Sequence, residues 1–180
     1  MFTIKKAGID ELPIIMDIIE AAREHLKAAG SPQWQGGYGP DEESMEQAIH
    51  QQICWVGLLD GYTVAVACLV SGEDPVYTAI QEGSWLTTDS DQYVSIHRFA
   101  VSSDFAGQGI ATRFLEALKV EALKVGYRDL RIDTYPKNYG MIRVIEKNGF
   151  QYRGKVYFPI PNGERVAFQL IKDQVKAVKN

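Results

Sequence analysis

Cysteine is scarce in this sequence, with only Cys54 and Cys68 among 180 residues. Both lie inside apolar runs, QICWVGLL and VAVACLVS, and they do not form a CxxC pair. This placement argues against a zinc site and against a disulfide framework, so we predict no metal site. We expect both cysteines to be reduced residues of the core.

An excess of positive charge is also missing. The formal net charge is -4 and the sequence pI is about 5.4, which argues against a general binder of nucleic-acid phosphates. The amino-terminal stretch MFTIKKAGIDELPIIMDIIEAA contains no continuous apolar run of the kind that forms a signal peptide or a membrane helix. We therefore expect no nucleic-acid partner, no membrane partner and a cytoplasmic protein.

The chain has enough apolar residues for one core. At 180 residues, with 46% apolar and 23% charged residues, it fits a single compact domain over 1–180. No internal repeat and no low-complexity tail interrupts it. The sequence is too short for a second domain of full size.

The first half of the sequence predicts two helices and an antiparallel hairpin. Residues 2–6 are typical of a short strand, and Asp10 is the expected N-cap of a helix with an apolar stripe that includes Ile15 and Ile19. A second helix is expected over about 41–51. Residues 53–59 and 62–70 form β-rich runs around Asp60-Gly61, a pair that favours a tight turn.

The second half predicts a parallel crossover and a final strand pair. A strand over 93–101, a helix over about 108–125 and a strand over 129–134 form one right-handed βαβ unit. Alternation along the strand over 93–101 predicts that five side chains share one face: Tyr93, Ser95, His97, Phe99 and Val101. A short helix over 138–147 precedes strands near 150–158 and 165–171. The expected fold is an α/β domain with a mixed sheet.

The segment VSSDFAGQGIATRFLEAL passes from strand to helix through Gly107 and Gly109 and holds no acidic residue between Asp104 and the helix. Glycines let a bulky anion approach the backbone, and the first amides of a helix lack partners and lie at the positive end of its dipole. A phosphate or diphosphate is therefore expected here, with Arg113 as a supplement. The alternative is a tight turn without a ligand.

Two other phosphate loops compete for this pattern. A Walker loop requires lysine followed by serine or threonine, whereas Gly109 is followed by Ile110 and Ala111, which excludes it. The dinucleotide fingerprint matches two of its three small positions, and Asp129 or Asp133 follows at roughly 20 residues. However, Thr112 replaces the third glycine and no second βαβ half follows. A dinucleotide-dependent oxidoreductase stays open as the weaker alternative.

Three segments together resemble the core of the GCN5-related N-acetyltransferase (GNAT) family: SIHRFAVSSDFAGQGIATRFL, LRIDTYPKN and MIRVIEKNGF, in this order and spacing. The layout before them, two helices and a hairpin, is also similar. The resemblance implies a GNAT-like domain that binds acetyl-CoA. The family usually has Arg or Gln where this chain has Ala106, so a side chain is lost at that position while the amide is kept.

The resemblance also implies which residues bind the donor. Backbone amides of the loop would face the diphosphate. The strand before it, which the family splays with a bulge, would bond the pantetheine and the acetyl carbonyl through its backbone, and Asn138 would contact the coenzyme or only cap its helix. The residues implied are Phe99, Ala100 and Val101 on the strand, Ala106, Gly107, Gln108, Gly109, Ile110, Ala111 and Thr112 in the loop and the helix start, and Asn138.

Acetyl transfer to an amine favours a general base, and the candidates are Glu73, Asp74, Glu82 and His97. We select Glu73, which follows the hairpin, and His97, although a histidine on a strand is more often structural. The family often places a tyrosine that protonates the departing thiolate where this chain has Ile145. Two nearby tyrosines could replace it, Tyr139, which we select, and Tyr135.

The acceptor pocket is expected near the loop GSPQWQGGYGP, where Trp34 and Tyr38 would bind substrate unless they only pack. Gln35 lies between them, and Trp85 and Tyr157 could extend the wall. The predicted function is transfer of acetyl from acetyl-CoA to a primary amine of a small molecule or peptide by direct attack. A non-catalytic acyl-CoA sensor is the alternative, and edge strands at the carboxyl end are compatible with a homodimer.

Overall fold

A computed structural model describes residues 1–87 and 92–172, and its described strands form one seven-stranded sheet. The order is β1-β2-β3-β4-β5-β7-β6, and β4–β5 is the one parallel pair in it. The predicted mixed sheet, hairpin and crossover are confirmed. The strands are β1 (Phe2–Lys6), β2 (Cys54–Leu59), β3 (Tyr62–Ser71), β4 (Tyr93–Val101), β5 (Asp129–Thr134), β6 (Gln151–Tyr157) and β7 (Glu164–Ile171).

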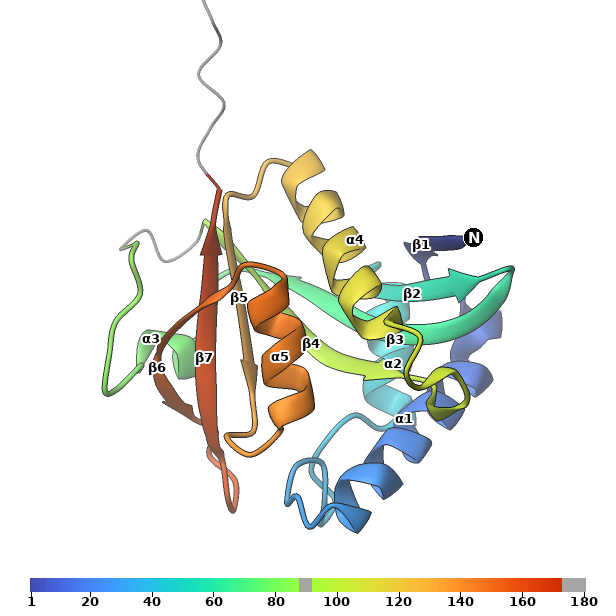
Figure 1. Ribbon diagram of the computed structural model, residues 1–180, viewed down its shortest axis with the longest axis horizontal. Coiled ribbons are helices and arrows are strands. Elements are labelled where there is room, and N and C mark those ends of the chain that lie inside the picture. The colour runs from blue at the N-terminus through green and yellow to red at the C-terminus, as the bar shows by residue number, and fades with distance from the viewer. Residues whose placement is uncertain (88–91, 173–180) are drawn as a thin grey trace, which may run out of the picture.

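Helices cover both faces of this sheet (Figure 1). On one face, α4 (Ile110–Lys124) and α5 (Tyr139–Lys147) pack around Phe114 and Ile145, which are fully buried. On the other face, α1 (Leu12–Ala28) and α2 (Glu42–His50) bury Ile15 and Ile19. Both cysteines lie in this second core cluster, as expected. Cys54 on β2 is opposite Cys68 on β3, and both are free thiols.

Several predicted boundaries shift for local reasons. Asp10 does not cap α1, because Ile9–Glu11 forms a 3₁₀ turn (η1) and Glu11 is the N-cap. The helix α4 begins at Ile110 and not at Gln108. The polar stretch after β3 contains a short helix, α3 (Pro75–Thr78), which the sequence pattern did not reveal. Residues 88–91 of that stretch lie outside the described residues, as do residues 173–180 of the predicted domain.

A bulge in β4 overturns the predicted alternation of its side chains. Arg98 adopts a left-handed conformation with φ 55°, and the β3–β4 register gains one residue on β4 between His97 and Ala100. An extra residue reverses the faces that follow it. His97 therefore stays on the face of Tyr93, while Phe99 turns to the opposite face and packs on Phe114 of α4, with ring centroids 5.4 Å apart.

The parallel pairing of β4 with β5 is short. It runs from Tyr93–Asp129 to Ile96–Ile132, so from His97 onward β4 is paired with β3 on one side only. The two strands diverge at their carboxyl ends, where ligands commonly bind in α/β sheets. No helix in the described ranges is long and apolar enough to cross a membrane.

Candidate functional site

A cavity of about 1130 Å³ opens where β4 and β5 diverge. This volume lies slightly above the usual range for small-molecule sites, roughly 300–1,000 Å³. Its walls come from α1, the loop after α1, the carboxyl ends of β4 and β5, the loop before α4, α5 and the β6–β7 connection. One cavity therefore joins the predicted anion loop to the predicted acceptor side.

The loop before α4 presents free backbone donors to this cavity. Within the described chain, the N–H groups of residues 107–112 have no protein acceptor, whereas Ala106 donates to the Ser103 carbonyl and Arg113 to the Gly109 carbonyl. The Ala106 amide is thus occupied, contrary to expectation, and the available series begins at Gly107. Gly109 is the N-cap of α4, with φ 71°, and no side chain caps the helix. These donors can hold a diphosphate.

Both loop glycines adopt a backbone conformation that favours glycine. Gly107 has φ 77° and Gly109 has φ 71°, in the left-handed region where a Cβ is strained. A Cβ built at either position meets no atom within 4 Å, and both residues line the cavity. A side chain there would occupy the space that the ligand needs.

The cation near this loop differs from the expected one. The guanidinium of Arg113 lies over the ring of Phe2, 5.1 Å from its centroid, and Arg113 does not line the cavity. Arg143 on α5 does line it. Sequence separation favoured Arg113, but helical geometry turns its side chain toward β1.

The splayed strand and the start of α5 complete the donor side. Phe99, Ala100 and Val101 all line the cavity, and the edge of β4 that no longer pairs with β5 faces it. Asn138 also lines the cavity, and its Oδ1 accepts from the Met141 N–H at 3.2 Å. Asn138 therefore caps α5, and its contact with the coenzyme stays a prediction.

His97 lies between two carboxylates at the other end of the cavity. Its Nε2 is 3.8 Å from Asp74 Oδ2, and its Nδ1 is 3.9 Å from Asp133 Oδ2. The Tyr77 hydroxyl donates to Asp133 Oδ2 at 2.7 Å. Burial raises the pKa of Asp133 above its usual value, although the nearby charge of His97 acts to lower that pKa. This group can attract a cationic amine and accept a proton from it.

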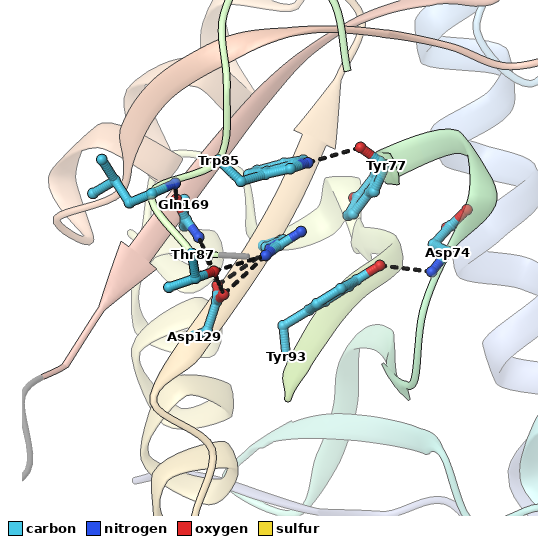
Figure 2. Close-up of polar contacts among 9 residues, drawn as sticks. Asp74, Tyr77, Trp85, Thr87, Tyr93, Asp129 and Gln169 are labelled. Carbon is cyan, nitrogen blue, oxygen red and sulfur yellow. Dashed lines mark hydrogen bonds and ion pairs between the residues drawn. The ribbon is translucent and has the colours of Figure 1, made fainter. Parts of the chain in front are cut away.

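A stack of rings holds Asp74 in place (Figure 2). The Asp74 N–H donates to the Tyr93 hydroxyl at 2.6 Å, and the Trp85 indole donates to the Tyr77 carbonyl at 2.7 Å. The guanidinium of Arg131 lies 3.8 Å from the Tyr93 ring centroid and 4.3 Å from that of Trp85. Cation–π contacts of a desolvated arginine contribute about 2 kcal/mol each. The stack therefore fixes the segment that carries Asp74.

The buried charge of Arg131 is neutralised within the sheet. Asp129 accepts from its Nε at 3.2 Å and from its Nη2 at 3.0 Å, and Thr87 accepts from Nη2 at 3.0 Å. Gln169 donates to Asp129 at 2.9 Å. A buried ion pair needs such satisfied partners to offset desolvation. Asp129, an alternative ribose ligand in the dinucleotide interpretation, is thus committed to Arg131.

Comparison with known proteins decides the family. Residues 19–150, well over half of the chain, match the Acetyltransferase (GNAT) family. The chain belongs to this family. A GNAT acetyltransferase from Streptococcus agalactiae 2603 is 38% identical, covers 96% of each chain and superposes with a TM-score of 0.87. No curated protein matches the sequence significantly.

More distant structures share the GNAT fold. The protein yncA from Salmonella typhimurium, solved with its cofactor acetyl-CoA, is 17% identical over 99% of this chain and 98% of that chain, with a TM-score of 0.69. The aminoglycoside acetyltransferase AAC(6')-Ib, solved with coenzyme A, is 19% identical over 96% and 95%, with a TM-score of 0.67. The expected fold, family and enzyme class are confirmed, and acetyl-CoA is the acyl donor of this GNAT enzyme. The oxidoreductase alternative is excluded.

Three predicted residues of the GNAT site do not line the cavity. Glu73 accepts from the Thr78 hydroxyl at 2.9 Å, and the Tyr139 side chain lies on the surface, with the residue 62% exposed. Gln108 lies in the loop but outside the cavity wall. Of the other candidates, Glu82 pairs with Lys155 at 3.0 Å, and Ile145 is fully buried in the core. The positions of Glu73 and Glu82 in the sequence do not distinguish them from Asp74, which does line the cavity.

The aromatic loop is only partly as expected. Trp34 and Tyr38 line the cavity, but Gln35 donates to the Arg23 carbonyl at 3.0 Å and holds the loop to α1. Trp85 belongs to the stack on Arg131, and Tyr157 does not reach the cavity. Their roles in substrate binding stay predictions.

Sequence reasoning missed Asp133, Arg165, Phe158 and Ile160 in the cavity wall. The dinucleotide interpretation names Asp133 only as a ribose ligand, although its position at the carboxyl end of a parallel strand also indicates a site residue. Arg165 lies on β7, next to β5 in the sheet. That adjacency follows from the strand order and is invisible along the sequence.

We predict that Gly109→Ala weakens coenzyme A binding at least about tenfold, because the new Cβ enters the diphosphate space, and lowers stability by roughly 1–2 kcal/mol through backbone strain. Isothermal titration and thermal unfolding measure the two effects. Gly126→Ala is the matched control, since Gly126 has φ 103°, an open Cβ position and no place in the cavity wall. Equal loss of affinity in both variants would contradict the assignment.

We predict that Asp133→Asn is more stable than the natural protein at neutral pH but at least tenfold less active. A raised pKa means that the folded state binds this proton more tightly than the unfolded state, so the group's stability contribution is present at low pH and is lost as pH rises through the folded pKa. The advantage of the variant should vanish below about pH 4. Urea unfolding over a pH series measures it, with Asp17→Asn, exposed on α1, as the control.

Proposed function

We propose that this GNAT enzyme transfers acetyl from acetyl-CoA to a primary amine of a small molecule or peptide by direct attack, with His97 as general base. One observation carries the proposal: a single cavity has free backbone donors at 107–112 on one side and His97 between Asp74 and Asp133 on the other. The diphosphate would bind at the first side and the acceptor at the second.

The amine must lose a proton before it attacks. An unperturbed lysine-like amine has a pKa near 10.4, so the neutral form at pH 7 costs about 4.6 kcal/mol. Asp74 and Asp133 attract the ammonium ion, and His97 takes its proton while the amine nitrogen bonds to the thioester carbonyl carbon. The free edge of β4 at Phe99 to Val101 supports the proposed hydrogen bond to that carbonyl oxygen.

The leaving thiolate needs less assistance. A thiol pKa near 8.5 lies about 1.5 units above neutral pH, so protonating it contributes roughly 2 kcal/mol at most. Ile145 is a core residue and cannot supply that proton, and the exposure of Tyr139 gives no support to its proposed role. Water can protonate a thiolate of this basicity, so the step does not depend on a tyrosine.

The wider predictions have partial support. We propose one acetyltransferase domain over 1–180, because a single sheet extends from residue 2 to residue 171. Cytoplasmic location is supported by two free thiols that face each other across β2 and β3. A homodimer through a sheet edge is restricted on β6, because Gln81 bridges to Lys155 there.

Turnover tests the proposal. Thiol release from acetyl-CoA should rise with an amine panel, and His97→Gln should lower kcat by about 10²–10⁴ while coenzyme A affinity stays unchanged. The loss should shrink at high pH, where more amine is already neutral. His50→Gln, on the exposed end of α2, is the control. Unchanged turnover in His97→Gln would remove His97 as base, and the absence of thiol release with every amine tested would favour the sensor alternative.

A further inference from the structure

Arg165 is a buried cation in the wall of the acceptor side. The residue is 5% exposed and lies on β7, where it lines the cavity together with Phe158. Its Nη1 donates to the carbonyls of Asn162 and Glu164, at 2.8 and 2.7 Å. Both bonds use the same nitrogen, and Nε and Nη2 make no hydrogen bond within the described residues.

No carboxylate in the described part of the chain lies within 4 Å of this guanidinium. The adjacent Glu164 is held by Lys155 at 2.9 Å. Asp133 is near enough to favour the charge of Arg165, but burial is the larger effect and lowers the pKa of the guanidinium. A buried charge without a direct partner is costly, and an anionic ligand would relieve that cost.

Two aromatic rings hold the guanidinium. The centroids of Tyr135 and Phe158 are each 5.8 Å from its central carbon. An arginine fixed by rings and by carbonyls keeps its planar fork in place, and this fork matches a carboxylate with two parallel hydrogen bonds. A less ordered cation, such as a surface lysine, would lack this geometric match.

Arg165 and His97 share one face of the sheet. Asp133 on β5 pairs with Ala167 on β7, and Arg165 lies two residues along β7 on the same side. Asp133 is also 3.9 Å from His97. The acceptor side therefore carries carboxylates around the base and a cation next to them, which suits an ammonium and a carboxylate within one small molecule or chain end.

We propose that the acceptor of this enzyme is an amine that also bears a carboxylate, which Arg165 binds while the amine lies at His97. The inference rests on the proposed function, because it places the acceptor at the same site. The shared chemistry is an amine close to a carboxylate, as in a free amino acid or in a short peptide with a free carboxyl end.

Matched acceptor pairs test this inference. Amino acids and dipeptides, each with its carboxyl amide, are assayed by thiol release and by isothermal titration against the enzyme saturated with coenzyme A. We expect at least about tenfold higher kcat/KM and tighter binding for the free acids. Arg165→Met should abolish that preference, and Arg165→Lys should restore part of it. A response to amino acids alone or to dipeptides alone would support the inference and identify the source.

Arg128→Met is the control variant, because Arg128 also donates through Nη1 to two backbone carbonyls but lies outside the cavity. Equal binding of acids and amides to the natural enzyme would overturn the inference, even if amides are acetylated and the proposed function stands. Tighter binding of the free acids without any thiol release would leave a carboxylate site at Arg165 but would overturn the proposed function, and with it the assignment of these molecules as acceptors. The natural enzyme alone decides the matter if Arg165→Met fails to fold.

Discussion

Backbone N–H groups that have no partner within the protein are the constraint on which this site depends. A helix leaves its first amides without acceptors, and a side chain at the N-cap normally takes one of them. In α4 the N-cap is Gly109, which has no side chain to offer, and the amides from Gly107 to Thr112 all lack a protein acceptor in the described residues. The chain thus keeps a row of donors for an anion, at the positive end of a long helix.

The bulge at Arg98 determines which side chains of β4 face each side of the cavity. It reverses the faces of β4, so Phe99 packs under α4 while His97 stays toward Asp74 and Asp133. The pairing with β5 has already ended at Ile96. The edge of β4 toward β5 is therefore free from His97 onward, and the bulge directs His97 and Phe99 to opposite faces of the strand.

The fold was largely predictable because it depends on local signals. Periodicity, the turn Asp60-Gly61 and the glycine loop predicted the hairpin, the crossover and the mixed sheet, and the family resemblance agreed. The short helix α3 was not predictable, and the bulge was implied only by the family resemblance, because neither changes the hydrophobic pattern. A bulge adds one residue to an otherwise ordinary strand, and only the pairing with β3 reveals it.

One part of the site was predictable from the sequence and the other was not. The anion loop is contiguous in sequence, so its residues could be proposed together, although the side-chain direction of Arg113 could not. The acceptor side is assembled from the start of α3 and from β4, β5 and β7, and Asp133 and Arg165 lie near His97 only because of the strand order. Glu73 and Asp74 are equivalent by their position in the sequence, and only the structure shows that Asp74 is the one that faces His97.

Amide chemical shifts of the ¹⁵N-labelled enzyme, followed during titration with coenzyme A, test the central claim most directly. The account predicts that the largest downfield proton shifts fall on residues 107–112, and that 3′-dephospho-coenzyme A, which keeps the diphosphate, reproduces them. Shifts centred on another helix start, with residues 107–112 unchanged, would contradict it.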